Sequence, residues 1–540
     1  MLPVIFIVCF TVFVRIAGIH YGLPLTTLVA DESGLIFAAL KMIQLKTLLP
    51  GLHSAAFEHI LYYPPYIAYL YIGPFLMFAG IKYIILGLSA GEFQNYIAAN
   101  LSPFFIIARS INIIFAAVSV WLVYKISLNL FKNKKAALVS CFFLATSMLH
   151  ISLSMVARHW LPASFLFLLG FYFLTRGDWS FKKRYLFTVL TAGIGMGITP
   201  ITGLIGVLMI LWYLFYERHG IGELFKEKFF YPLFFIFVLL AVVPVILYPS
   251  SYNFFKESTG VARSLFEFIA SPFFFLKPAF ITEPVLMLFA LLGIGSAFLF
   301  KRNLFPVALI FTFVYSAFFY LAYWYLHRFI LPLLCFLMIF AGYGFAQFWE
   351  RFRSIGFRIV AVTLLLIPLV ISLQFSYLAY KGDSRVLAKE WAEKNLPAGV
   401  KVIVAGDVRL LTAPDAVEEK RILDPDSINK FDGLDSYSDE VRRGTAVFYA
   451  LNLDYVDAES SFYENTDAYI IEHHYEYMII RTNDGRFLQT DGLKGRVQAL
   501  KSFGSPDDLY RHYYNEFISN PVGLFKINGL GPQITIYKIR

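Results

Sequence analysis

Residues 304–326 read LFPVALIFTFVYSAFFYLAYWYL, a run of 23 residues without Asp, Glu, Lys or Arg. A helix that crosses a lipid bilayer needs roughly 20 such residues, because inside lipid every backbone amide must bond within its own helix. The chain contains further charge-free runs of this kind, at Tyr185–Tyr216, Phe229–Pro249, Pro284–Phe300 and Phe329–Phe348. The sequence therefore predicts a polytopic α-helical membrane protein.

The composition is uneven along the chain. The 540 residues are 58% hydrophobic and 15% charged, whereas a soluble domain carries about 25% charged residues. Charges are rare before Tyr380 and frequent after it. We expect a membrane domain over residues 1–380 and a water-soluble domain over residues 381–540. The three cysteines lie in apolar segments, so the pattern predicts neither a disulfide framework nor a thiolate metal site.

Basic residues set the predicted orientation. A net charge of +9 could suggest a nucleic-acid partner, but the cations sit in short clusters between apolar runs, and membrane orientation explains them better. The positive-inside rule places 16 of them in the cytoplasm. They are Lys125, Lys132, Lys134, Lys135, Arg176, Lys182, Lys183, Arg184, Arg218, Lys226, Lys228, Lys301, Arg302, Arg351, Arg353 and Arg358.

Eleven crossings satisfy this rule and place residues 381–540 outside the cytoplasm. The first crossing is expected to be a retained anchor, because it is longer than a signal-peptide core and lacks a convincing cleavage site. The crossings are predicted near 2–21, 104–124, 136–153, 160–175, 186–199, 201–216, 229–249, 284–300, 304–325, 329–348 and 359–379.

Two segments complicate this topology. Residues Tyr66–Ala90 are apolar enough to span, but counting them as a crossing would invert every later basic loop. We expect an interfacial or re-entrant segment within a first outer loop, 22–103, with a twelfth span as the alternative. The run 186–216 is interrupted by Gly193, Gly195, Gly197 and Pro200, which predicts a hairpin of two short crossings.

After Tyr380 the pattern becomes that of a soluble α/β domain. The amphipathic stretch Ser384–Asn395 predicts a helix, Pro397 to Gly399 a turn, and Val400–Ala405 a buried strand. Further strands are predicted at Ala468–Glu472, Tyr477–Arg481 and Ile534–Ile539.

Ionisable residues on the outer side are the candidates for chemistry. Asp31 and Glu32 follow the first crossing, where they suit acid–base chemistry; alternatively, Asp31 caps a helix over Glu32–Gln44. Tyr62 and Tyr63 precede a Pro-Pro pair that favours a helix start at Tyr66. Basic residues at outer helix ends either anchor the interface or bind an anionic lipid head group. These are Arg109, Arg158, His159, His327 and Arg328.

The order of these features resembles the GT-C superfamily of membrane glycosyltransferases, especially family 39, the branch of protein O-mannosyltransferases and aminoarabinose transferases. The resemblance covers roughly residues 1–350 and depends on the order, spacing and sidedness of several segments. They are the Asp31-Glu32 pair with ESGLIFAALKMI, YYPPYIAYLY, ARSINIIFAAVSVWLVYKISLNLF running into KNKKAALVSCFFLATSMLHISLSM, AGIGMGITPITG, and HRFILPLLCFLMIFAG.

This resemblance implies transfer of a sugar from a polyprenyl-phosphate donor to a protein, lipid or glycan acceptor on the outer face, with inversion at the sugar carbon. Asp31 matches the residue regarded as the general base, and Glu32 would support it. The other candidates would bind the donor phosphate or position the substrate. The phosphate ligands would be Arg109, Arg158, His159, His327 and Arg328, and the positioning residues Tyr62 and Tyr63. No cofactor or nucleic-acid partner is expected.

The chain also departs from the family. Tyr63 stands where the mannosyltransferases have His and the aminoarabinose transferases often have Lys, so a donor contact is lost or moved. The stretch ARHWLPAS at 157–164 lacks a second acidic residue, which disfavours a metal-dependent variant. A transporter or lipid flippase is the alternative function, although such proteins carry ionisable groups near the membrane midplane. A catalytically inactive scaffold is a third.

Overall fold

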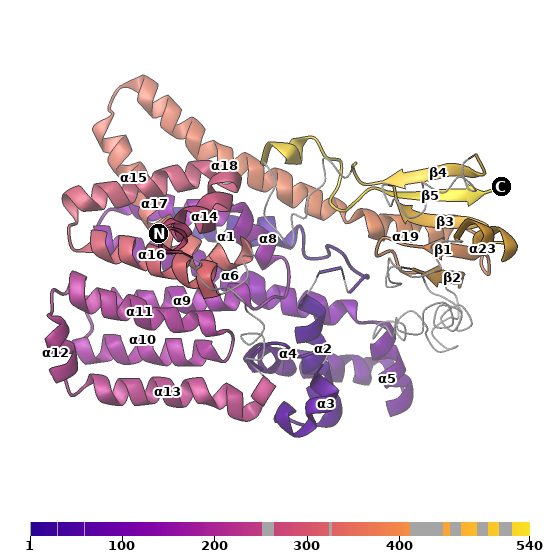
Figure 1. Cartoon of the computed structure of the whole chain (residues 1–540), viewed down its shortest axis with the longest axis horizontal. Helices are drawn as coiled ribbons and strands as arrows, with labels where there is room; N and C mark the ends of the chain where they lie inside the picture. The colour runs from indigo at the N-terminus through magenta and orange to yellow at the C-terminus, as the bar shows by residue number, and fades with distance from the viewer. Residues whose placement is uncertain are drawn as a thin grey trace.

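The computed structural model describes residues 2–26, 28–29, 31–58, 60–250, 264–322, 327–410, 447–453, 466–482, 495–506 and 521–540. A bundle of apolar helices fills one end of the molecule, and a five-stranded sheet lies at the other (Figure 1). This arrangement confirms the predicted fold class, a helical membrane protein with a carboxy-terminal α/β region.

A helix coincides with every predicted crossing. Five helices of the described chain are long and apolar enough to cross a membrane, and two bent helix pairs raise this number to seven. Shorter apolar helices account for five of the other predicted crossings, and α10 (Phe181–Met196) coincides with the crossing predicted near 186–199. The helices concerned are α1 (Leu2–Ile16), α6 (Ser102–Phe131), α7 (Lys134–Thr146), α8 (Met148–Ser154), α9 (Trp160–Leu174), α10 (Phe181–Met196), α11 (Leu204–Leu211), α13 (Phe230–Leu247), α15 (Pro284–Phe300), α16 (Leu304–Ala322), α17 (Leu331–Arg351) and α18 (Ile355–Lys381).

The sequence missed helix α14 (Leu265–Thr282). Its 18 residues include Glu267, Lys277, Pro272 and Pro278, which interrupt the charge-free, proline-free pattern that marks a crossing. The predicted hairpin within 186–216 is present as α10 and α11, with a short 3₁₀ turn at Pro200–Gly203 between them.

Helix α17 forms the centre of the bundle. It packs against α7, α9 and α15, and every residue in its most apolar window is buried. A glycine is required at its contact with α15, because a Cβ atom on Gly293 would lie 1.9 Å from the Phe340 carbonyl oxygen. This close approach gives the bundle a rigid core behind the outer loop.

The segment predicted to be the first outer loop, 22–103, contains four helices: α2 (Glu32–Leu45), α3 (Ser54–Phe57), α4 (Tyr66–Leu86) and α5 (Ala90–Ala99). Helix α4 is long enough to span, yet only 11% of its apolar window is buried. Figure 1 shows it nearly end-on, whereas α10, α11 and α13 run across the page. Helix α4 thus lies across the direction of those helices, as a helix along the membrane surface would, and its interfacial position stays a prediction.

Gly197 fixes the start of α4. The Tyr66 amide donates to the Gly197 carbonyl oxygen at 3.1 Å, and a Cβ atom on Gly197 would meet the Tyr66 ring at 2.1 Å. The glycine-rich segment singled out in the sequence therefore provides a close contact between the bundle and the outer loop.

The carboxy-terminal α/β region contains a sheet with strand order β2-β1-β3-β5-β4. The strands are β1 (Lys401–Val404), β2 (Tyr449–Asn452), β3 (Tyr477–Arg481), β4 (Val497–Phe503) and β5 (Ile534–Ile539). Strand β1 pairs in parallel with β2 and β3, while β5 runs antiparallel to β3 and β4. Helix α19 (Ser384–Asn395) begins and ends where the sequence predicts.

One strand prediction in this region is wrong, and two strands were missed. Residues Ala468–Glu472 lie in helix α23 (Thr466–Glu472), which precedes β3 in the connection from β2. Parallel strands need a crossover, usually a helix, and this topological demand overrides the strand-like composition of the segment. The short strand β2 and the largely exposed strand β4 lack a clear buried-strand pattern.

Candidate active site

Helix α6 positions several of the candidate site residues. Arg109 and Asn112 lie one turn apart on it and are both buried. The Asn112 amide nitrogen donates to the carbonyl oxygens of Val156 at 2.6 Å and Arg158 at 3.0 Å. These two bonds fix the turn between α8 and α9 that carries Arg158 and His159.

Arg109 binds Glu32 within the protein. Its Nε and Nη2 atoms donate to the two carboxylate oxygens of Glu32, each at 2.7 Å, in a bidentate pair. Its Nη1 atom donates to the carbonyl oxygens of Ile19 and Tyr21, both at 2.7 Å. The Glu32 residue is 0% exposed and Arg109 1%. The guanidinium of Arg109 therefore holds the end of α1 and the start of α2 together.

Glu32 also sets the register between two loops. Its Oε1 atom accepts a bond from the Ala157 amide at 2.6 Å. Asp31 precedes Glu32 and Arg158 follows Ala157, so this bond brings Asp31 opposite Arg158. The pairing of Asp31 with Arg158 is thus a consequence of the buried contacts behind it.

Three donors converge on one oxygen of Asp31. Arg158 Nη2 forms an ion pair with Asp31 Oδ2. The Tyr63 hydroxyl donates to the same oxygen at 3.3 Å, and Arg328 Nη2 lies 3.5 Å from it. The Asp31 side chain is 24% exposed, whereas the Glu32 side chain is 1% exposed. The Asp31 cluster is therefore accessible from the protein surface, and the Glu32 pair is not.

The backbone at Asp31 does not suit a simple cap. Asp31 occupies the N-cap position of α2 with φ of 66°, in the left-handed region. Within the described chain its side chain accepts no capping bond from the first turn. A non-glycine residue in this conformation is uncommon and concentrates at functional sites. The structural alternative, a capping carboxylate, is therefore not what this side chain does.

The arginines control the charge of Asp31. Burial alone would raise the pKa of its carboxyl group, but the guanidinium groups of Arg158 and Arg328 outweigh burial and lower the pKa to about 2. Burial, followed by the Asp31 charge, raises the pKa of the Tyr63 hydroxyl well above its usual value. At neutral pH the cluster therefore contains a carboxylate, two guanidinium ions and a neutral phenol.

His159 lies beside this cluster as a neutral ring. Its ring centroid is 4.1 Å from that of Tyr63 and 4.4 Å from that of Trp160. Burial lowers its pKa well below the usual value. Neither ring nitrogen has a hydrogen-bond partner among the described residues, although the side chain is completely buried.

The structure brings together most of the candidates from the sequence. Tyr62 lies apart, near Tyr248, with an exposed side chain. The side chain of His327 lies outside the described residues, and its backbone begins a 3₁₀ turn, His327–Ile330. Within the described ranges, no three His, Cys, Asp or Glu side chains gather as a metal ion would require.

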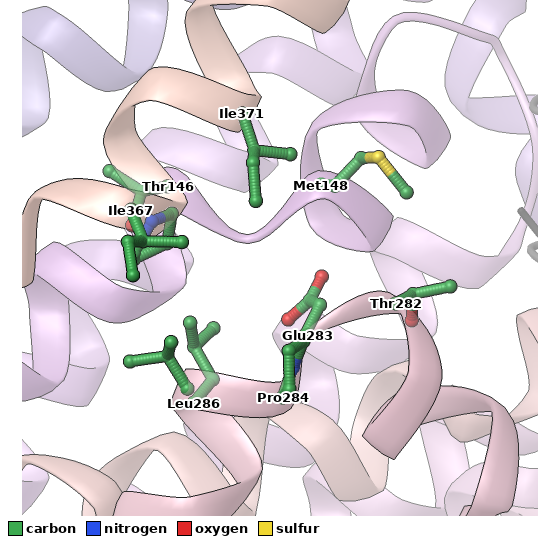
Figure 2. Close-up of a pocket in the computed structure, with 10 residues that line it drawn as sticks. Thr146, Met148, Thr282, Glu283, Pro284, Leu286, Ile367 and Ile371 are labelled. Atoms are coloured by element: carbon green, nitrogen blue, oxygen red, sulfur yellow. The ribbon is translucent and has the colours of Figure 1, made fainter. Parts of the chain in front are cut away.

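A second buried polar group was missed from the sequence. The Glu283 side chain accepts bonds from the Ser147 hydroxyl at 2.7 Å and the Leu149 amide at 2.9 Å. Figure 2 shows its carboxylate pointing toward the segment between Thr146 and Met148, where α7 and α8 bend by 55°. Glu283 thus satisfies polar groups that the bend exposes.

Arg15 and His150 form a further internal pair, with Arg15 Nη2 2.6 Å from His150 Nδ1. Arg15 also donates to the carbonyl oxygens of Thr11 and Ala145. Ionisable groups inside a membrane bundle often mark a transport path. Here the contacts tie α1 to the bent α7–α8 pair, and they explain these residues as parts of the fold.

Comparison with known families gives one match. Residues 105–248, which are 144 of the 540 residues, match the family model of dolichyl-phosphate-mannose-protein mannosyltransferases. This match indicates a membrane glycosyltransferase. It confirms the predicted resemblance to the GT-C superfamily and covers the segment that carries Arg109, Arg158 and His159. Comparison with curated protein sequences gave no match.

Solved membrane glycosyltransferases are weakly similar to the chain. The oligosaccharyltransferase AglB from Archaeoglobus fulgidus, in complex with an inhibitory peptide and a dolichol-phosphate, has 13% identity and a TM-score of 0.44 over 89% of this chain and 69% of its own. ArnT from Cupriavidus metallidurans, bound to undecaprenyl phosphate, has 11% identity and a TM-score of 0.44 over 99% and 97%. Both TM-scores lie below 0.5, so these likenesses do not establish a function.

Proposed function

We propose that this glycosyltransferase moves a sugar from a polyprenyl-phosphate-linked donor to an acceptor on the outer face of the membrane, with Asp31 as general base. The observation that carries the proposal is the position of the Asp31 carboxylate, partly exposed and facing Arg158 and Arg328. A base and an anion-binding pair of guanidinium groups at one opening are the two elements that this reaction needs.

The proposed reaction is a single displacement. The acceptor hydroxyl oxygen forms a bond to the anomeric carbon while the bond from that carbon to the phosphate oxygen breaks. The hydroxyl proton passes to Asp31, and the electron pair of the broken bond remains on the lipid phosphate. Arg158 and Arg328 stabilise that added negative charge, since guanidinium groups match phosphate oxygens in bidentate geometry.

The geometry refines the roles predicted for the other residues. Arg109 was predicted to bind the donor phosphate, but it donates four hydrogen bonds to Glu32 and to the carbonyls of Ile19 and Tyr21. We therefore assign Arg109 and Glu32 to positioning Asp31. Tyr63 and His159 would orient the substrate beside the carboxylate. The roles of Tyr62 and His327 stay predictions from the resemblance.

An outward orientation of the carboxy-terminal sheet is supported by its distance from a basic loop of the bundle. Helix α12 (Ile221–Lys226), in one of the basic loops, lies at the end of the bundle opposite the sheet (Figure 1). Together with the positive-inside rule, this separation supports an outer position for the sheet. In a Cys9→Ser background, a Lys394→Cys variant should react with an impermeant thiol reagent on intact cells, and Lys182→Cys only after permeabilisation. The opposite labelling would reverse the orientation.

The function itself is tested in cells that lack the gene. Mass spectrometry of envelope glycans and glycoproteins should reveal a hexose or pentose that is missing without the protein, restored by the natural chain and not restored by Asp31→Asn at equal abundance. An unchanged glycan profile across all three strains would contradict the proposal. Altered distribution of an intact lipid across the membrane would favour the flippase alternative.

A further inference from the structure

The ion pair of Asp31 presents a difficulty for its role as a base. Catalytic bases work best when their pKa lies near the operating pH, whereas the arginines hold the pKa of Asp31 at about 2. The carboxylate that should accept a proton and the guanidinium groups that should bind phosphate are instead bound to one another.

The donors of this arrangement come from separate parts of the chain. Tyr63 precedes α4, Arg158 lies in the turn before α9, and Arg328 lies in the turn before α17. Tyr63 and Arg158 each donate a hydrogen bond to Asp31 Oδ2. The Nη2 atom of Arg328 lies 3.5 Å from the same oxygen. Such convergence of positive and donor groups on one oxygen is the arrangement expected of an anion site.

We propose that Asp31 occupies this anion site in the resting protein and that the phosphate of the lipid donor displaces it from Arg158 and Arg328. The inference depends on the proposed function, because it identifies what the lipid phosphate does at that site. A phosphate group offers several charged oxygens to the two guanidinium forks, whereas Asp31 offers one oxygen to both.

Displacement would turn Asp31 into an effective base. Once the two guanidinium groups bind phosphate, their influence on the carboxylate is offset by the phosphate charge, and the burial that raises the pKa of Asp31 is no longer outweighed. The base would then gain proton affinity only when a donor is present. Among the described residues, His159 and Tyr63 are the other titratable groups facing Asp31, and both are neutral at physiological pH.

The backbone permits such a movement. Glu32 is held by Arg109 and Ala157, so the start of α2 stays in place. Asp31 lies one residue before this fixed point, its side chain is partly exposed, and it makes no capping bond to α2 among the described residues. A change of its side-chain rotamer would release the arginines without disturbing the buried contacts.

Binding of undecaprenyl phosphate to purified protein in nanodiscs tests this inference. Asp31→Asn removes the competing charge and keeps the shape of the side chain, so it should bind the lipid about tenfold more tightly or better, which is the range expected for hydrogen bonds to a charged group. Asp31→Ala should bind the lipid at least as tightly as Asp31→Asn does. Glu92→Gln, which removes an exposed charge from α5, should bind like the natural protein.

Inorganic phosphate is the second probe. If a free phosphate ion is enough to displace Asp31, inorganic phosphate should compete with the lipid for the protein. It should compete better in Asp31→Asn than in the natural protein. If only the lipid binds more tightly in Asp31→Asn, the displacing ligand is the membrane-embedded head group. Both results support the displacement and differ in the source of the phosphate.

Two results would overturn the inference in different ways. Equal or weaker lipid binding by Asp31→Asn and Asp31→Ala, with normal thermal unfolding, would mean that Asp31 orients the arginines and does not compete with phosphate; the proposed function would survive. Failure of the natural protein to bind either phosphate compound would remove the proposed function as well.

Discussion

Two consecutive carboxylates, Asp31 and Glu32, have opposite environments. Glu32 is fully buried and is bound by Arg109 through two 2.7 Å bonds and by the Ala157 amide. Asp31 is partly exposed, lies in a left-handed backbone conformation and shares one oxygen among Arg158, Tyr63 and Arg328. The first arrangement is closed to ligands, and the second is open to them.

The difference shows how a reactive group is positioned. A buried ion pair contributes little net stability because desolvation offsets its attraction, but losing one partner is costly. The Glu32–Arg109 pair therefore acts as a rigid reference point for the loop. Asp31 can be placed accurately beside Arg158 and still remain accessible, since the rigid contacts are made by its neighbour.

The largest expected effect comes from changing Asp31 to Asn. This variant cannot accept the acceptor proton, and general-base contributions are about 10²–10⁴-fold in rate, so sugar transfer should fall by about 100-fold or more. The protein should stay folded and still bind the lipid donor. Transfer is measured on purified protein or from the envelope glycans, with thermal unfolding as the control. Nearly normal transfer would remove Asp31 from the mechanism.

Changing Arg109 to Ala should mainly affect stability. It leaves Glu32 as an uncompensated buried charge, which costs about 3–5 kcal/mol, and it frees the carbonyls of Ile19 and Tyr21. Thermal unfolding in detergent measures this loss, and adding Glu32→Gln should recover part of it. If Arg109→Ala is as stable as the natural protein but no longer binds lipid phosphate, Arg109 is a donor ligand, as the sequence resemblance implies.

The sequence predicts the architecture better than the site. Charge-free runs located the apolar helices, because such runs depend on local composition. The outer position of Asp31, Arg158 and Arg328 stays a prediction. The bond between Arg109 and Glu32 joins residues 77 positions apart, and no local pattern separates it from a phosphate contact. The bend at α7–α8 and the Glu283 carboxylate that stabilises it depend on packing in the same way.

Changing Arg328 to Ala should weaken lipid binding and leave the Glu32 pair intact. A charge-assisted hydrogen bond is worth about 1.5–3 kcal/mol, or about 10–150-fold in affinity. Arg328→Lys should recover only part of the affinity, because a lysine lacks the planar fork. Binding of undecaprenyl phosphate and thermal unfolding are measured together. Unchanged binding by both variants would reduce Arg328 to an interface anchor.

The smallest effect is expected from Tyr21→Phe, which tests whether the rigid contacts around Glu32 and Arg109 extend to the carboxy-terminal region. The Tyr21 carbonyl accepts from Arg109 and its hydroxyl donates to Asp383, a buried residue at the N-cap of α19. Phenylalanine keeps the first contact and loses the second. Because Arg385 still pairs with Asp383, we expect a loss of about 1 kcal/mol in stability with normal lipid binding.

Tyr380→Phe, at an exposed tyrosine near the same junction, is the matched control. If Tyr21→Phe weakens lipid binding as much as Arg328→Ala does, the soluble domain takes part in holding the donor, and the division between a closed and an open carboxylate would not describe the site.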